Sequence, residues 1–249
     1  MVVLKTSREL KVMREACRIS AEALKLAGSA VEPGVTTAEL DKLAEKFILS
    51  QGAKPNFKNY NGYPATACIS INNEVIHGIP SKKRVIKSGD IVSIDLGACF
   101  EGYHGDNAAT FACGDISEEA KRLIDTTRES LYEGISAAVS GGRLGDIGAA
   151  IQQYVEQRGF SVVRKFVGHG IGTQLHEAPE VPNFGTFGRG IRLMPGMTLA
   201  IEPMINAGHY DVKVMPDGWT VLTKDGSLSA HFEHTIVITP DGPQILTKA

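Results

Sequence analysis

Apolar residues recur at every third or fourth position near the start of the chain, which is the spacing of an amphipathic helix. These positions are Leu10, Met13, Cys17, Ala21 and Leu24. Just before them, Thr6 and Glu9 have the spacing of an N-terminal capping box, in which two side chains satisfy backbone N–H groups at the helix start. The pattern therefore predicts a helix over about residues 7–27 that ends at Gly28.

Three further helices follow from the same kind of signal. Thr36 and Glu39 form a second capping box, and the helix after them is expected to close near Gly52. Ser117 is the predicted N-cap of a third helix, and a fourth runs over about 145–159. The rest of the chain reads as strands between Gly and Pro turns, at 65–73, 84–100, 102–113, 161–168, 197–206, 218–224 and 229–239.

The second half of the chain repeats the first at a constant offset of 107 residues. The offset connects Leu24 with Leu131, Gly34 with Gly141, Gly52 with Gly159 and Asp95 with Glu202. We interpret the chain, 1–249, as one domain with related halves of about 7–113 and 114–247; coincidental glycine matches are the alternative. Neither half could bury its apolar face alone, so the predicted fold is α+β, with a central antiparallel sheet covered by helices.

Composition narrows the classes of function. Of 249 residues, 43% are hydrophobic and 22% charged, which is typical of a globular protein and excludes a disordered chain. With 26 basic and 28 acidic residues the net charge is −2, so no specific nucleic acid is expected as a partner. No apolar run is long enough to span a membrane, and the N-terminus lacks a signal-peptide core. Four cysteines without a CxxC pair favour a cytoplasmic protein.

Four acidic residues stand in segments that otherwise read as buried strands: Asp95, Asp106, Glu202 and Glu233. Taken singly, each could be a solvated edge residue. Together they indicate a site, because a buried carboxylate is costly unless it is paired or binds a metal. A turn near residues 100–102 would place Asp95 and Asp106 opposite each other, where like charges repel unless a cation lies between them. Two divalent ions would neutralise all four acids.

Histidine supplies the nitrogen ligand that borderline metals favour, and His169 in Gly-His-Gly-Ile-Gly is the best candidate. An oxygen-rich set with one nitrogen and no thiolate suits Mn, Fe(II), Co or Zn. His77 and His176 lie in similar segments bounded by Gly or Pro and are candidates for substrate contacts. Weaker candidates are His104, His209, His231 and His234.

Aromatic residues suggest where a substrate side chain would lie. Tyr60, Tyr63 and Cys68 occupy a turn-rich stretch before a strand, which we interpret as the wall of a small apolar pocket, with local packing as the alternative. Trp219 follows an Asp-Gly turn, where surface packing is the simpler explanation.

Five segments carry a resemblance to a known family, and they are ACISINNEVIHGIP, SIDLGACFEGYHGD, GHGIGTQLHEAP, AIEPMI and SAHFEHTIVIT. Together they resemble the type I methionine aminopeptidases, metallopeptidases of the pita-bread fold, over about residues 4–247. The resemblance implies a hydrolase that removes the N-terminal methionine from nascent proteins and peptides, preferably before a small second residue. In that reaction a metal-activated hydroxide attacks the first peptide bond.

The resemblance also implies roles for individual residues. The ligands of two metal ions would be Asp95, Asp106, His169, Glu202 and Glu233. Glu202 would also move protons, while His77 and His176 would contact the substrate and the tetrahedral intermediate. The expected substrate-binding wall is Phe57, Tyr60, Tyr63, Cys68, His77, His176 and Trp219. Two residues of this region depart from the family pattern: Phe57 stands where many relatives have Cys, and Leu175 where others have Phe.

The expected partners are the N-termini of nascent chains at the ribosome, and the expected state is a monomer. Only 33 positions separate His169 from Glu202, which leaves no room for the helical subdomain of the type II enzymes. Two alternatives stay open. One is a binding module of the same fold without hydrolysis, against which the intact ligand set argues. The other is a metallopeptidase specific for Xaa-Pro sequences.

Overall fold

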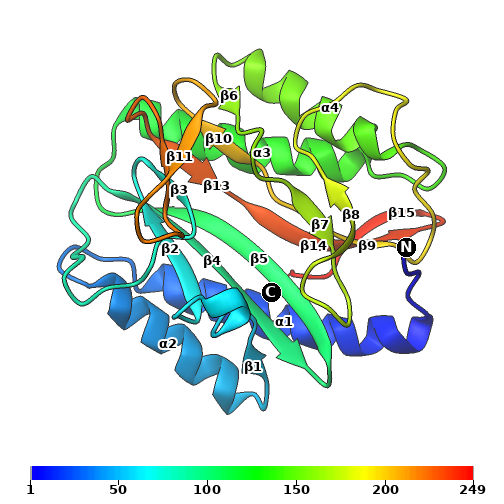
Figure 1. The fold of residues 1–249 in the computed structure, drawn as a ribbon, viewed down its shortest axis with the longest axis horizontal. Coiled ribbons are helices and arrows are strands. Elements are labelled where there is room, and N and C mark those ends of the chain that lie inside the picture. Colours follow the sequence, from blue (N-terminus) through cyan, green and yellow to red (C-terminus); the bar gives the residue numbers. More distant parts are fainter. Residues whose placement is uncertain (1, 249) are drawn as a thin grey trace.

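The computed structural model describes residues 2–248, and it contains two pairs of helices on a large curved sheet (Figure 1). The helices are α1 (Ser7–Ser29), α2 (Thr37–Ser50), the short 3₁₀ helix η1 (Tyr60–Gly62), α3 (Glu118–Ala137) and α4 (Leu144–Glu156). The strands are β1 (Lys54–Pro55), β2 (Ala67–Ile71), β3 (Glu74–Ile76), β4 (Ile91–Phe100), β5 (Tyr103–Ala112), β6 (Ser161–Val162), β7 (Gly168–Gly170), β8 (Glu177–Val181), β9 (Thr198–Ile201), β10 (Met204–Asn206), β11 (Val212–Val214), β12 (Val221–Thr223), β13 (Ser229–His231), β14 (Glu233–Thr239) and β15 (Gly242–Ile245). Among residues 2–248, no helix is both long and apolar enough to cross a membrane.

The main sheet has nine strands in the order β1-β4-β5-β14-β9-β7-β8, with β2 beside β4 and β15 beside β14. Every strand pair in it is antiparallel, as predicted. Two three-stranded sheets, β13-β10-β6 and β11-β12-β3, complete the molecule. In Figure 1 the blue helices α1 and α2 lie along the lower side and the green helices α3 and α4 along the upper side, with β4, β5 and β14 between them.

The predicted helix starts agree with the structure. The backbone N–H of Thr6 donates to the Glu9 carboxylate at 2.7 Å, and the backbone N–H of Glu9 donates back to the Thr6 hydroxyl at 3.4 Å. The same box opens α2, and Ser117 caps α3. The first helix, however, does not end at Gly28. This glycine lies inside α1, and the position requires glycine because a Cβ there would meet the Phe111 ring at 2.2 Å.

Each helix pair has its own apolar core against the sheet. Buried side chains of α1 and α2, such as Ile19 and Leu40, pack on Ile94 of β4. Buried side chains of α3 and α4, such as Leu131 and Ile147, pack with residues of β9 and β14. Two amphipathic helix pairs therefore cover two halves of one sheet, which is what the repeat in the sequence implied.

The repeat is visible in single hydrogen bonds. The N–H of Gly34 donates to the carbonyl of Ile86 at 2.9 Å, and 107 residues later the N–H of Gly141 donates to the carbonyl of Leu193 at 2.9 Å. The isolated bridges 36↔85 and 143↔192 obey the same offset. These matches support two pseudo-symmetric halves, while their exact boundaries stay a prediction.

Two threonines join the halves where β5 meets β14. The Thr235 hydroxyl donates to the carbonyl of Asp106 at 2.8 Å and accepts from its N–H at 3.1 Å. The Thr110 hydroxyl makes the same two bonds to His231, at 2.9 Å each. Thr110 and Asp106 thus correspond to Thr235 and His231, each 125 residues later. The seam between the halves is a reciprocal pair of side-chain bridges.

We expect Thr235→Val to lower the free energy of unfolding by about 2 kcal/mol, because it leaves the buried N–H and carbonyl of Asp106 without partners. Urea denaturation of the two proteins measures the difference. Thr235→Ser keeps the hydroxyl and serves as the control, with a loss well below that of the valine variant. Equal losses for both variants would show that the methyl group, not the hydroxyl, stabilises this seam.

Candidate metal centre and substrate pocket

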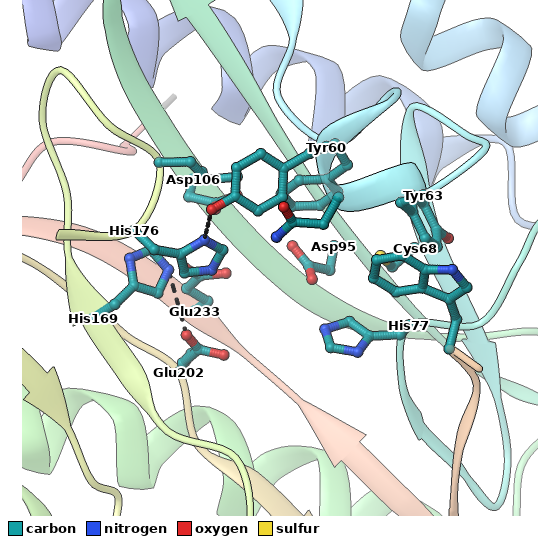
Figure 2. Close-up of a pocket in the computed structure, with 14 residues that line it drawn as sticks. Tyr60, Tyr63, Cys68, His77, Asp95, Asp106, His169, His176, Glu202 and Glu233 are labelled. Atoms are coloured by element: carbon teal, nitrogen blue, oxygen red, sulfur yellow. Dashed lines mark hydrogen bonds and ion pairs between the residues drawn. The ribbon is translucent and has the colours of Figure 1, made fainter. Parts of the chain in front are cut away.

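A cavity of about 230 Å³ opens over the centre of the main sheet. Its lining residues are Phe57, Tyr60, Asn61, Tyr63, Cys68, His77, Asp95, Asp106, His169, Leu175, His176, Glu202, Trp219 and Glu233. Figure 2 shows the acids and His169 on one side of the cavity and Tyr63, Cys68 and His77 on the other. All five predicted metal ligands and all seven predicted substrate-binding residues therefore meet in one place.

The four acids come from the middle strands of the sheet. Asp106 and Glu233 are each only 3% exposed. One carboxylate oxygen of each of these residues, and one of Asp95, is buried without a hydrogen-bond partner among the described residues. Such orphaned oxygens are rare in folded proteins because desolvation is not repaid. They are the donor atoms that divalent cations require, so the residues present fit a metal centre.

The register of the β4–β5 hairpin corrects one expectation. Asp106 pairs with Gly97, and Asp95 pairs with Ala108, so the two acids are diagonal neighbours rather than directly opposite. The reason is the turn at Glu101–Gly102, which shifts the partner of Asp95 by two residues from the register that the sequence suggested, from Asp106 to Ala108. Because the offset is two residues, both side chains still point to the same face.

Burial and mutual repulsion both oppose ionisation of the acids. Burial raises the pKa of Asp95 to about 8. Burial and the neighbouring charges of Asp95 and Glu202 raise the pKa of Asp106 well above its usual value. The pKa values of Glu202 and Glu233 are raised for the same reasons. A bound cation would reverse this balance, since it favours the ionised form of every carboxylate around it.

His169 faces this cluster from β7. It is 7% exposed, and its Nδ1 donates to the carbonyl of Gly170 at 2.9 Å, which leaves Nε2 free. Nε2 lies 3.6 Å from Glu202 Oε1, the contact dashed in Figure 2. Ligand atoms of Asp106, His169 and Glu233 lie within 4.8 Å of one another. Burial lowers the pKa of His169 to about 3, so the ring is neutral at pH 7, the form that binds metals.

A second group of potential ligands consists of Asp95, Glu233 and His231. The sequence analysis gave His231 no specific role, because nothing in the local pattern separates it from a structural histidine. Two other weak candidates lie elsewhere: His104 bonds to Asn56 at 2.8 Å, and His234 bonds to Thr247 at 2.9 Å.

His176 and His77 reach the cavity from opposite sides. His176 Nδ1 lies 2.8 Å from the Tyr60 hydroxyl, and its ring centroid is 4.2 Å from that of His169. His77 has a left-handed backbone with φ 59°, a rare conformation for a residue other than glycine. Strain of this kind is concentrated at functional sites. Burial lowers the pKa of His77 to about 4, so this ring is neutral as well.

The apolar wall of the cavity is built on Tyr63. Its hydroxyl donates to the carbonyl of Gly78 at 2.9 Å, and its ring meets the Trp219 ring edge-on at a centroid distance of 5.1 Å. Cys68 and Phe57 pack in the same cluster. Trp219 is therefore part of the wall, and surface packing does not describe it. Asn61, which the sequence analysis did not mention, also lines the cavity and has φ 49°.

A buried ion pair anchors the segment that carries Leu175 and His176. Lys5 Nζ lies 2.5 Å from Glu177 Oε2, and the two side chains are only 2% and 11% exposed. Glu177 also accepts the backbone N–H of Gln174 at 3.1 Å. The N-terminal segment is thereby joined to the start of β8, directly after His176.

The sequence profile of metallopeptidase family M24 matches residues 11–240. The chain therefore belongs to the metallopeptidases of family M24. Membership of this family confirms the predicted use of divalent metal. The two buried groups of acids and histidines agree with it.

Similarity within the family extends over the whole chain. The chain is 58% identical over 247 residues to a protein named methionine aminopeptidase from Clostridium perfringens, with 99% of each chain covered. It is 54% identical to methionine aminopeptidase 1 of Bacillus subtilis, with 100% of each covered. The crystal structure of methionine aminopeptidase from Thermotoga maritima superposes with a TM-score of 0.99 at 46% identity, covering 100% of both chains. The predicted resemblance to type I methionine aminopeptidases is confirmed.

A more distant likeness supports the fold. The prolidase from Pyrococcus horikoshii superposes with a TM-score of 0.80 at 26% identity, covering 100% of this chain and 64% of that chain. These comparisons confirm the predicted pita-bread fold and the predicted enzyme class, a metal-dependent aminopeptidase.

We predict that the metal-free protein loses stability between pH 7 and 8.5. Unfolded carboxyls are fully ionised in this range, whereas the folded acids hold protons because their pKa values are raised, so folding becomes less favourable as they are forced to ionise. We expect Tm after chelation to fall by about 5 °C or more. Calorimetry at both pH values measures this.

Asp106→Asn is the control for this measurement. It removes one charge from the cluster, so the remaining acids repel less and Tm should depend less on pH. Restoring a divalent metal should raise Tm more at pH 8.5 than at pH 7. A chelated protein whose Tm rises with pH would contradict the electrostatic account.

Lys5→Met should lower the free energy of unfolding by about 3 kcal/mol, because Glu177 would be left buried and unpaired. Urea denaturation measures the loss. The exposed pair of Arg128 and Asp125, at 2.7 Å, provides the control: Arg128→Met should cost less than about 1 kcal/mol. Similar losses for both variants would show that burial does not govern the Lys5 pair.

Proposed function

We propose that this protein removes the N-terminal methionine from polypeptides, preferably before a small second residue, with two divalent metal ions. The observation that carries the proposal is the set of buried carboxylate oxygens without partners, placed beside a neutral imidazole at one side of an apolar cavity. The names of the relatives support the substrate, and the preference for a small second residue comes from the resemblance to their family.

The resemblance to the family implies that Asp106 and Glu233 would be ligands of both ions, and Glu233 belongs to both groups of potential ligands. Asp95 would complete the surroundings of one ion, and His169 with Glu202 those of the other. When bound, the ions supply Lewis acidity that makes water a nucleophile near neutral pH. Mn, Fe(II), Co and Zn all suit this donor set, so availability in the cell would decide among them.

Glu202 is placed to move the proton. Its carboxylate lines the cavity, its side chain is only 15% exposed, and its Oε1 lies 3.6 Å from Nε2 of His169. It would accept the proton of the attacking water and pass it to the leaving amine.

Two neutral histidines would orient the peptide bond. His176 Nδ1 lies 2.8 Å from the Tyr60 hydroxyl, and with the hydroxyl as donor in this bond, Nε2–H of His176 would be free to donate to the substrate. His77 faces the same space from the other side. Donors of this kind stabilise the oxyanion of the tetrahedral intermediate, with a loss of about 10²–10³ in kcat when one is removed.

The methionine side chain would lie against the wall of Tyr63, Cys68, Trp219, Phe57 and Leu175. Aromatic rings contact a thioether favourably, and the wall carries no charge. The physiological substrates would be nascent chains, acted on at the ribosome by a monomer in the cytoplasm.

We expect hydrolysis of a Met-Ala-Ser peptide when Mn, Fe(II) or Co is supplied, and none after chelation. Asp106→Asn should abolish activity and reduce bound metal below two ions per chain, because it removes a shared ligand. Amino-acid release and elemental analysis measure both quantities.

An Ala-Pro peptide is the comparison that separates the functions still open. The structural likeness to the prolidase at 26% identity makes an Xaa-Pro activity the second candidate. Faster release from Ala-Pro than from Met-Ala-Ser would establish that activity instead. Peptide binding without cleavage under any of the three metals would indicate a binding module.

A further inference from the structure

We propose that His231 is a sixth protein ligand of the metal centre and binds, through Nε2, the ion held by Asp95 and Glu233. This inference rests on the proposed function, in which the cluster holds two divalent ions. It adds a nitrogen to an ion that would otherwise be surrounded by protein oxygens alone.

The first support is the state of the imidazole. His231 is 1% exposed, and its Nδ1 lies 3.3 Å from the carbonyl of Pro203. A carbonyl can only accept, so Nδ1 carries the proton and Nε2 presents a lone pair. Nε2 is buried and has no hydrogen-bond partner among the described residues. Metal-binding histidines are oriented in this way, with one nitrogen bonded to a backbone carbonyl and the other free.

The second support is position. Ligand atoms of Asp95, His231 and Glu233 all lie within 4.8 Å of one another. Two atoms bound to one ion at about 2.0–2.2 Å are roughly 3–4.4 Å apart, so small side-chain rotations complete the group. One carboxylate oxygen of Asp95 and one of Glu233 are orphaned like Nε2. Each of the three residues of this group thus has one buried acceptor atom without a partner, and a cation could satisfy all three.

The third support is the duplication of the fold. Thr110 holds the backbone of His231 in the same way as Thr235 holds that of Asp106. His231 therefore occupies, in the second half, the place that Asp106 has in the first. Asp106 belongs to the other ligand group, with His169 and Glu233. Each ion would then have one imidazole, and Glu233 would belong to both groups.

Proton NMR of the Co(II)-loaded protein tests the inference. A histidine bound to Co(II) through Nε2 gives a strongly shifted, solvent-exchangeable resonance from its Nδ1–H, and the bonds to Gly170 and Pro203 protect both protons from exchange. We expect two such resonances in the wild-type protein. His231→Gln should remove one of them and His169→Gln the other.

His234→Asn is the matched control, because this histidine lies on the next strand and bonds to Thr247. It should keep both resonances. In parallel, a Co(II) titration should show that His231→Gln weakens one of two binding steps by at least about tenfold, the scale on which even outer-shell partners of a metal act.

A wild-type spectrum with a single shifted resonance, lost only in His169→Gln, would overturn the assignment of His231 and leave the proposed centre intact. Failure to bind Co(II) at all would instead overturn the proposed function. The wild-type spectrum alone gives the number of imidazole ligands, so the test does not depend on the folding of any variant.

Discussion

Repulsion among four buried carboxylates is the constraint on which the rest of the structure depends. Asp95, Asp106 and Glu233 lie on apolar strands and Glu202 directly follows β9, and the packing of these strands brings the acids together with little access to water. Burial and mutual repulsion raise their pKa values, so the acids resist ionisation when no cation is present. With cations the same oxygens become ligands. The same burial lowers the pKa values of the surrounding histidines and keeps them neutral. Burial in the sheet therefore makes both oxygen and nitrogen donors available to a cation.

Duplication explains how the main sheet brings the acids and histidines together at its centre. Each half contributes two central strands, and the halves meet where β5 pairs with β14. Positions related by the duplication do not carry the same residue. Asp106 corresponds to His231, and the threonine bridges hold both backbones alike. The backbone frame is therefore close to symmetric while the residues at equivalent positions differ, so the two groups of potential ligands are not alike.

The chemistry and the recognition of substrate are divided between different parts of the fold. Asp95, Asp106 and Glu233 lie on strands, and Glu202 directly follows one, so the backbone hydrogen bonds of the sheet position the acids. The aromatic wall comes from the segment around η1 and from Trp219, outside the central strands. His176 lies on a loop. The buried pair of Lys5 and Glu177 anchors the chain at the residue that directly follows this loop. A remote N-terminal lysine thereby contributes to the geometry of the site.

The sequence alone determined the helix starts, the long strands β4, β5 and β14, the repeat and the identity of the acids, whereas β8, β11 and β15 were not predicted. These features depend on neighbours a few residues away: the capping box of Thr6 is complete within three positions, and a carboxylate in an apolar strand is unusual wherever the strand packs. Tertiary structure decided what depends on distant contacts. Position 28 requires glycine because Phe111 packs closely on it, and the diagonal arrangement of the two aspartates follows from the hairpin register. The surroundings of His231 were not readable from the sequence for the same reason, since its free nitrogen is defined only by a carbonyl 28 residues away and by acids from other strands.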